Sequence, residues 1–244
     1  MESGGQNFST QELLKIGGVL NRSIVSLSKS VDFEIRGGKK LSGSIATNFS
    51  KNGSVVLLCA ALLNRGKTTL HGISRIEEVN RLIEILQSIG IKVSWVAKNS
   101  VEIIPPKTFS FDALDRAAAA RVRSGLMLIG PLMHRVSSFS LPHAGGCKMG
   151  NRTIAAHRYG LESLGIKIVT KEQEYVVRAG KLKPADIVMY EAGDTAANNL
   201  LMAAALIPGT TVIRFAPPNY QVQELCFFLE AMGVKIEGIG STTL

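Results

Sequence analysis

Three strongly apolar segments recur along the chain, and each is followed by an amphipathic segment. The apolar segments span residues 52–64, 116–134 and 195–207. A helix that is apolar on nearly every side must be buried all round. The amphipathic segments, such as EEVNRLIEILQSIG at 77–90, have one apolar face and are expected at the surface. The pattern therefore predicts three internal helices surrounded by outer helices.

A short motif recurs once after each apolar segment. LQSIGIKV at 86–93 returns as LESLGIKI at 161–168 and as LEAMGVKI at 229–236. Each copy passes from a helical pattern to a β-branched one, and its central glycine is the residue type that ends a helix in the left-handed conformation. These glycines are Gly90, Gly165 and Gly233. We predict that each outer helix ends at its glycine and continues into a strand.

The repeats predict an α/β fold of three βαβαββ units, an inside-out barrel-like domain with three buried helices. Residues 1–30 are predicted to be a poorly ordered leader, and residues 31–244 a single domain. The expected units span about 40–105, 106–180 and 181–244. The third unit ends at KIEGIGSTTL, inside its last predicted hairpin, so one sheet is expected to have an open edge.

Composition narrows the class of protein. The 244 residues are 45% hydrophobic and 19% charged, which excludes a disordered chain. Three widely spaced cysteines form neither a disulfide framework nor a zinc motif, so we expect a reducing cytoplasm. No apolar run approaches the length of a membrane span, and the first residues lack the charge pattern of a signal peptide. We therefore expect no membrane association and no export.

The net charge of +9 indicates an anionic partner. Phosphorylated metabolites and nucleic acid are both candidates. The basic residues are dispersed and aromatic residues make up only 6% of the chain, which argues against nucleic acid because bases stack on aromatic side chains.

The segment SLPHAGGCKMGNRTIAAH at 140–157 holds the most distinctive chemistry. Two glycines precede Cys147, and Lys148 and Arg152 follow it. Nearby cations favour the thiolate, so Cys147 could be a nucleophile or a proton donor; the alternative is a surface thiol in a glycine turn. Cys59 and Cys226 lie in apolar helical runs and are expected to be buried. His143 and His157 could be acids or bases, although a single histidine is more often structural.

Cations also stand beside the predicted starts of the internal helices. Lys51 and Asn52 lie where the first begins, a position at which free backbone N–H groups favour anions. Arg121 and Arg123 could lie near the start of the second. A buried arginine must be paired, so each would reach either an internal carboxylate or the phosphate of a ligand. With Arg152, these side chains could form an anion pocket.

At these positions the sequence resembles the enolpyruvyl transferases, specifically the branch that uses UDP-N-acetylglucosamine. The resemblance runs from roughly Phe33 to Leu244. Its markers are SKN at 50–52 followed by CAALL, VRSGLMLIGPL around Arg123, GGCKMGNR with Cys147 and Arg152, HRYGLESLG from His157, and GTTVI at 209–213. The cysteine segment separates this branch from the related shikimate-pathway synthase.

The resemblance implies transfer of the enolpyruvyl group of phosphoenolpyruvate to the 3-hydroxyl of UDP-N-acetylglucosamine, in peptidoglycan precursor synthesis, with no cofactor and no metal. Lys51 would hold phosphoenolpyruvate, and Asn52 would contact substrate. Arg123 and Arg152 would neutralise phosphate and carboxylate charge. Cys147 would protonate the enolpyruvyl methylene and could bond covalently to it. A second domain or chain, absent here, would complete the site with an aspartate.

The sequence also differs from the family pattern. Thr153 and Ala155 replace a proline and an aspartate, and Pro218, Asn219, Tyr220 and Gln221 replace an acidic Arg-Glu-Pro-Glu segment. Two alternatives stay open. One is a non-catalytic protein of the same fold that binds nucleotide sugars or acts as a scaffold; the other is binding of nucleic acid through net charge.

Overall fold

The computed structural model describes residues 37–38, 40–143 and 153–244. The helices are α2 (Lys51–Ala60), α3 (Glu77–Ser88), α4 (Arg116–Arg121), α5 (Ile129–Leu132), α6 (Ala155–Ser163), α7 (Asp194–Ala204) and α8 (Tyr220–Ala231). Within the described ranges the 3-10 helices are η1 (Ala61–Leu63), η2 (Phe111–Ala113) and η3 (Arg123–Leu128). The strands are β1 (Thr68–His71), β2 (Lys92–Ala97), β3 (Ser100–Ile104), β4 (Ser138–Pro142), β5 (Ile166–Thr170), β6 (Glu174–Ala179), β7 (Asp186–Val188) and β8 (Val212–Arg214).

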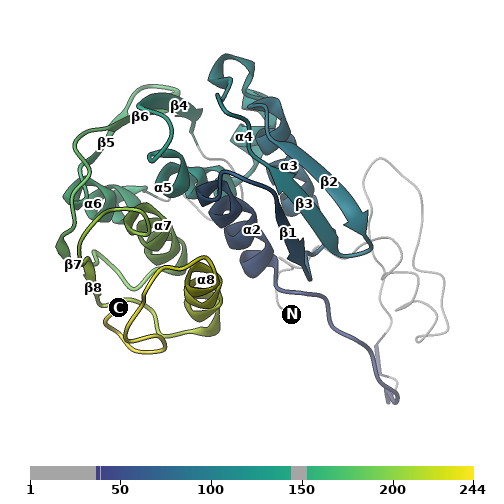
Figure 1. The fold of residues 1–244 in the computed structure, drawn as a ribbon. Coiled ribbons are helices and arrows are strands. Elements are labelled where there is room, and N and C mark those ends of the chain that lie inside the picture. The colour runs from purple at the N-terminus through teal and green to yellow at the C-terminus, as the bar shows by residue number, and fades with distance from the viewer. Residues whose placement is uncertain (1–36, 39, 144–152) are drawn as a thin grey trace.

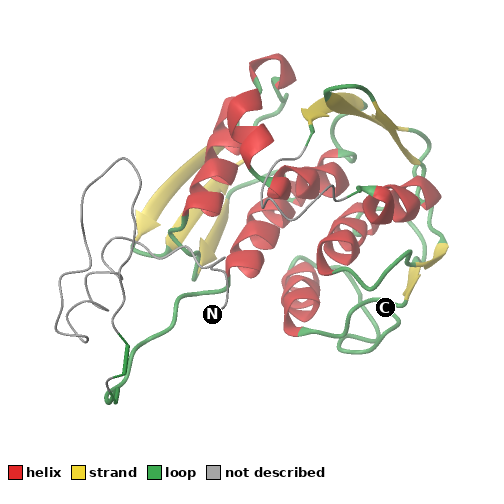
Figure 2. Cartoon of the chain, turned by 180° about the vertical axis from the view of Figure 1, so that it is seen from behind, coloured by secondary structure: helices red, strands yellow, loops and turns green. Residues whose placement is uncertain are grey.

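The described strands form three small sheets that lie around a group of helices (Figure 1). Their strand orders are β1-β3-β2, β4-β6-β5 and β7-β8. Seen from behind, the helices gather between the sheets (Figure 2). Helices inside and sheets outside are the inside-out arrangement that the repeats predict, and the described strands do not close into a barrel.

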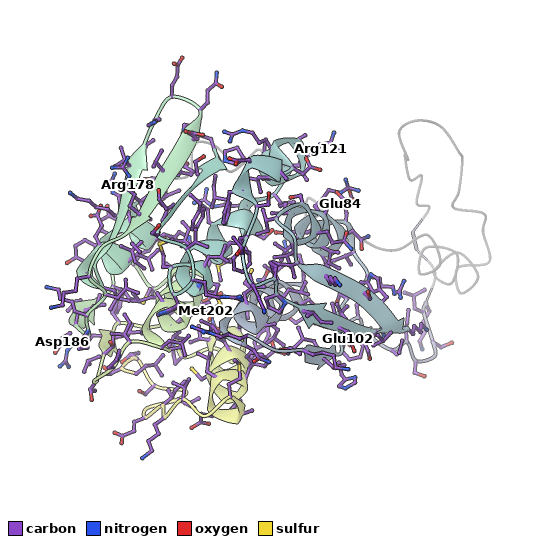
Figure 3. All side chains as sticks on the ribbon, turned by 45° about the horizontal axis from the view of Figure 1, so that its top comes forward. Glu84, Glu102, Arg121, Arg178, Asp186 and Met202 are labelled. Carbon is purple, nitrogen blue, oxygen red and sulfur yellow. The ribbon has the colours of Figure 1, made fainter. Side chains whose placement is uncertain are left out.

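The predicted internal helices form the core. Leu58 and Cys59 of α2, Leu128 and Ile129 at the junction of η3 and α5, and Met202 of α7 are all fully buried. The five charged side chains labelled in Figure 3 lie at the outside of the fold, whereas Met202 lies among the central helices. η3 packs against both α2 and α7, so one core joins all three units.

The second internal helix is broken, which the apolar pattern did not predict. α4 ends at Arg121, Val122 is extended, and the chain continues as η3 and then α5. In a continuous α-helix the Gly130 N–H would donate to the Leu126 carbonyl. Instead it donates to Oδ1 of Asn199 on α7 at 2.7 Å, while Asn199 Nδ2 donates to the Leu126 carbonyl at 2.9 Å. The side chain of Asn199 thus replaces a backbone hydrogen bond of the helix.

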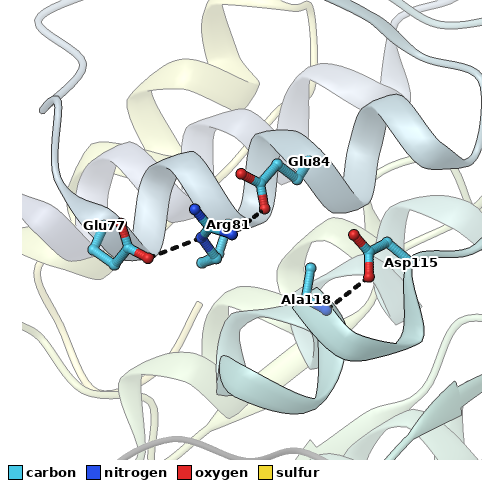
Figure 4. Close-up of polar contacts among 5 residues, drawn as sticks. All are labelled: Glu77, Arg81, Glu84, Asp115 and Ala118. Atoms are coloured by element: carbon cyan, nitrogen blue, oxygen red, sulfur yellow. Dashed lines mark hydrogen bonds and ion pairs between the residues drawn. The ribbon is translucent and has the colours of Figure 1, made fainter. Parts of the chain in front are cut away.

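The outer helix α3 shows the predicted amphipathic pattern. Val79, Leu82 and Leu86 face the core, and Arg81 forms ion pairs with Glu77 and Glu84 on the opposite face (Figure 4). The neighbouring helix α4 is capped by Asp115, whose carboxylate accepts from the Ala118 N–H at 2.8 Å.

The three repeated glycines adopt the left-handed conformation that the motif predicts. Gly90, Gly165 and Gly233 have φ angles of 94°, 95° and 95°. Each lies just after an outer helix, α3, α6 or α8. An L-residue with a side chain rarely adopts such angles, so glycine is needed at all three turns.

The three units are not identical, and the predicted βαβαββ order appears only in part. Residues 40–50 and 105–110 form no leading strand before α2 and α4; Pro105 and Pro106 lack the N–H that a ladder needs. The third unit has its leading strand, because β7 pairs in parallel with β8. Residues 234–241, expected to be a strand and a turn, form no strand. Leu244 instead exchanges two backbone hydrogen bonds with Ile213 of β8.

Candidate anion-binding site

Lys51 and Asn52 lie in the first turn of α2, as the sequence predicts. Ser50 caps this helix, because its Oγ accepts from the Gly53 N–H at 3.1 Å. The free N–H groups and the dipole of a helix N-terminus favour a negative charge at this position. Both side chains are therefore placed beside an end of the helix that attracts anions.

The Lys51 ammonium is paired with a carboxylate from the neighbouring outer helix. Its Nζ lies 2.6 Å from Oε2 of Glu78 on α3, and the two side chains are 46% and 21% exposed. A partly exposed pair of this kind contributes little to stability. Lys51 is thus accessible to solvent, but an incoming anion has to compete with Glu78 for it.

Asn52 is linked to the first turn of α8. Its Nδ2 donates to Oε1 of Gln221 at 2.9 Å. In the same turn, Asn219 caps α8 and its Nδ2 donates to Oδ1 of Asp194, the first residue of α7. The N-terminal ends of α2, α8 and α7 are therefore joined by side-chain hydrogen bonds.

Arg123 is the first residue of η3 and lies beside the N-terminal end of α6. Its Nη2 donates to the Thr153 carbonyl at 2.8 Å. Arg121 ends α4 on the other side of the extended Val122 and is exposed. The expectation that both arginines lie near the start of one continuous buried helix is therefore wrong, because the helix is interrupted between them.

Cys147 and Arg152 lie outside the described residues. The structure places the residues on either side of their segment. The His143 N–H donates to the Gln173 carbonyl at 3.1 Å, and Thr153 Oγ1 accepts from the Ala155 N–H at 3.0 Å. Since Thr153 also accepts from Arg123, one end of the cysteine segment is joined to an arginine that the sequence assigns to the same site.

His157 is structural in this fold. It is 5% exposed on α6, and its Nδ1 accepts from Asn199 Nδ2 at 3.2 Å. Burial, together with the nearby charge of Arg123, lowers the pKa of His157 to about 4, so the ring is neutral at physiological pH. Cys59 and Cys226 are buried, and burial raises the pKa of both thiols, that of Cys226 to about 11. Neither cysteine has the character of a nucleophile.

Three polar residues at the site were not predicted. They are Glu78, Gln221 and Glu224. The Glu224 carboxylate lies against Gly53, and its Oε2 is buried without a hydrogen bond, so burial raises the pKa of Glu224. Glu78 lies on the next helix, α3, whereas Gln221 and Glu224 lie on α8 in the third unit. Nothing in a single sequence marks which outer-helix residues turn toward Lys51 and Asn52.

Two negative findings apply to the described ranges. Within residues 37–38, 40–143 and 153–244, no three His, Cys, Asp or Glu side chains gather as metal ligands. Among the helices assigned there, none combines the length and apolar character of a membrane span.

The fold is that of the enolpyruvyl transferases. The enolpyruvyl transferase NikO from Streptomyces tendae superposes with a TM-score of 0.72 at 21% identity, over 86% of this chain and 49% of NikO. EPSP synthase from Acinetobacter baumannii superposes with a TM-score of 0.63 at 19% identity, over 81% of this chain and 45% of the synthase.

The family model for EPSP synthase (3-phosphoshikimate 1-carboxyvinyltransferase) matches residues 35–244, and the chain belongs to this family. Relatives named UDP-N-acetylglucosamine 1-carboxyvinyltransferase include one from Bradyrhizobium diazoefficiens, 37% identical over 214 residues, and one from Dichelobacter nodosus, 31% identical over 211 residues. These alignments cover 88% and 86% of this chain but 49% and 50% of the relatives. The chain thus spans about half the length of the relatives it matches.

Proposed function

We propose that this chain forms one half of a cytoplasmic UDP-N-acetylglucosamine 1-carboxyvinyltransferase, an enzyme of peptidoglycan precursor synthesis. The observation that carries the proposal is the first turn of α2. There Lys51 and Asn52 stand together at a helix N-terminus, in a chain 37% identical to a relative of that name. The substrates would be phosphoenolpyruvate and UDP-N-acetylglucosamine.

The proposed reaction is an addition followed by an elimination. The 3-hydroxyl of the sugar adds to C2 of phosphoenolpyruvate while Cys147 gives a proton to the methylene at C3. Loss of a proton from the new methyl group and of phosphate from C2 then restores the double bond. Positive character develops at C2 during protonation, so fixed charges around a water-poor site would lower the barrier.

The described residues suit the charge of these substrates. Lys51 would hold the phosphate or carboxylate of phosphoenolpyruvate by displacing Glu78, and Asn52 would offer hydrogen bonds to substrate. Arg123, joined to the residue next to Arg152, would add charge at the end of the cysteine segment. The base that takes the proton from the sugar hydroxyl would come from the remaining half, since the chain spans about half of its relatives.

Alkylation of Cys147 tests the proposal directly. An epoxide that resembles phosphoenolpyruvate should modify Cys147, as read by intact mass and peptide mapping, and UDP-N-acetylglucosamine should protect it. Cys147→Ser is the matched control. The buried Cys59 and Cys226 should stay unmodified because burial raises the pKa of both thiols. An inert Cys147, or a Cys147 that reacts but is not protected by UDP-N-acetylglucosamine, would contradict the proposal.

Calorimetry with UDP-N-acetylglucosamine separates the proposal from a binding-only protein. The proposal expects turnover when the missing half is added as a separate chain. Micromolar binding with no turnover under that condition would favour a nucleotide-sugar-binding or scaffold protein of the same fold, an alternative that the altered segment at 218–221 motivates.

A further inference from the structure

Gln221 connects the candidate site to the first turn of α8 through both ends of its side-chain amide. Its Oε1 accepts from Asn52 Nδ2 at 2.9 Å, and its Nε2 donates to the Tyr220 hydroxyl at 3.3 Å. In this orientation the Gln221 amide has a hydrogen-bond partner at both its oxygen and its nitrogen. Gln221 therefore presents an acceptor, and not a donor, to Asn52.

The backbone beneath Gln221 is fixed as well. Its N–H donates to Oδ1 of Asn219 at 3.1 Å, and the Val222 N–H donates to the same oxygen at 3.3 Å. Asn219 is in turn bonded to Asp194 of α7. The position of Gln221 thus depends on the junction of α8 with α7 and not on α2 alone.

Asn52 is oriented as a result. One N–H of its Nδ2 is taken by Gln221, whereas its Oδ1 receives no hydrogen bond from the described residues. A side-chain carbonyl with free lone pairs accepts from a hydroxyl or an amide. If the Asn52 amide turned over, it would offer its oxygen to the oxygen of Gln221, and that contact is repulsive.

Charge explains why a neutral acceptor suits this position. Two carboxylates already lie close to the first turn of α2: Glu78 pairs with Lys51, and Glu224 packs against Gly53. A third carboxylate at position 221 would also accept from Asn52, but it would weaken the attraction of this turn for an anion. The Gln221 amide provides the hydrogen bond without the charge.

We propose that Gln221 is a positioning residue for Asn52: it turns the Asn52 carbonyl oxygen toward substrate and keeps the surroundings of Lys51 free of a further negative charge. The substrate group it selects is a hydrogen-bond donor, a hydroxyl or an amide of the sugar, located beside an anion held by Lys51. This inference rests on the proposed function and adds a residue that determines the orientation of substrate in that site.

The first test needs no ligand. In the ¹⁵N-labelled chain, the Asn52 side-chain amide is assigned by its disappearance in Asn52→Asp. Its resonances should shift in Gln221→Leu and stay in place in Gln223→Leu. Gln223 is the matched control because it lies on the same helix and donates to the Pro218 carbonyl at 2.9 Å. Unchanged Asn52 resonances in Gln221→Leu would overturn the inference whatever the substrate.

The second test is a double-mutant cycle read by calorimetry with UDP-N-acetylglucosamine. Gln221→Leu should weaken binding about five- to tenfold, and it should have no further effect in an Asn52→Ala background. Gln221→Glu should keep the Asn52 resonances near their wild-type positions and weaken binding most at low salt, because it keeps the acceptor and adds charge. Thermal unfolding of each variant controls for loss of folding.

The outcomes separate the two claims. A full-length wild-type chain that binds no UDP-N-acetylglucosamine, alone or with the missing half, contradicts the proposed function. If the wild-type chain binds UDP-N-acetylglucosamine but Gln221→Leu and Asn52→Ala weaken binding additively, the inference is overturned and the proposed function is not. If the role of Gln221 is purely structural, the effects on binding should be additive. Gln221→Leu should then lower the melting temperature in both the wild-type and the Asn52→Ala background.

Discussion

The Lys51 ammonium forms an ion pair with Glu78, so an anionic substrate has to compete with the Glu78 carboxylate for it. Glu78→Gln should strengthen binding of phosphoenolpyruvate by about threefold or more at low salt, because the substrate no longer displaces a carboxylate. Glu102→Gln is the matched control, since Glu102 lies on β3 and pairs with Lys67 at 3.0 Å and not with Lys51. Calorimetry measures both; equal affinities in Glu78→Gln and wild type would show that Glu78 does not compete.

His157 makes stability depend on pH in a definite direction. Its pKa is lowered from 6.5 to about 4, so the folded state resists the proton that the unfolded state accepts. The stabilisation is complete above about pH 6.5 and is lost as the pH falls toward 4, by about 3 kcal/mol in total. Urea unfolding of wild type and His157→Gln across this window should diverge with pH. Parallel curves for wild type and His157→Gln would refute the assignment.

At the scale of single residues, the sequence identified the residue types but not their partners. Lys51 and Asn52 could be placed at a helix start because the cap signal of Ser50 is local. Glu78 and Gln221 could not, since each meets its partner only after separate helices have packed together, α3 of the same unit for Glu78 and α8 of the third unit for Gln221. The structural role of His157 was one of two readings that the sequence allowed, and its partner Asn199 decides between them.

Among the helices, Asn199 links α7 to the broken segment η3–α5. Asn199→Leu would leave the Gly130 N–H and His157 without partners and should cost about 3–5 kcal/mol. Its neighbour Asn198 is equally buried, yet its Oδ1 has no described partner, so Asn198→Leu should cost under about 1 kcal/mol or stabilise. Chemical denaturation of both variants tests this difference; similar losses would mean that burial alone matters.

The contact between α5 and α7 also restricts residue 130 to glycine. A Cβ on Gly130 would collide with the backbone oxygen of Asn199, and a backbone atom cannot move aside easily. Gly130→Ala should therefore destabilise the chain by about 2 kcal/mol or more. Gly125→Ala, on η3 with open space at its Cβ, should be neutral or stabilise by up to about 1 kcal/mol. Thermal unfolding compares the pair, and a tolerated Gly130→Ala would contradict the close approach of the two helices.

At the scale of elements, periodicity predicted which segments are internal and where the outer helices end. It did not predict the break at Val122, because an apolar run looks the same whether its backbone bonds are satisfied by the helix or by Asn199. Nor did it show that residues 234–241 form no strand, since a β-branched pattern becomes a strand only beside a suitable partner.

The whole molecule should unfold as one unit, because the three internal segments share a core. Trp95 is the single tryptophan and lies on β2 in the first unit, whereas Leu200 lies on α7 in the third. Leu200→Ala should lower stability by about 2–5 kcal/mol. It should shift the Trp95 fluorescence transition and the far-ultraviolet circular dichroism transition together. If Leu200→Ala leaves the Trp95 fluorescence transition unchanged, the first unit unfolds independently.

For the molecule as a whole, the internal repeats were the most informative part of the sequence. They predicted three α/β units with helices inside, because a segment that is apolar all round has only the interior available to it. The anion site was predictable only in part, since its cations lie at local helix starts while the carboxylates and amides around them come from other helices, α3 and α8.

Because the Asn199 side chain replaces a backbone hydrogen bond of α5, the amide proton of Gly130 reports on the contact between the second and third units. The Gly130 N–H is protected by a side chain 69 residues further along the chain. Fraying of its own helix therefore leaves that proton bonded, and only separation of α5 from α7 exposes it to solvent. The hydrogen-exchange rate of Gly130 should accordingly measure the opening between the second and third units, a motion distinct from local breathing of either helix.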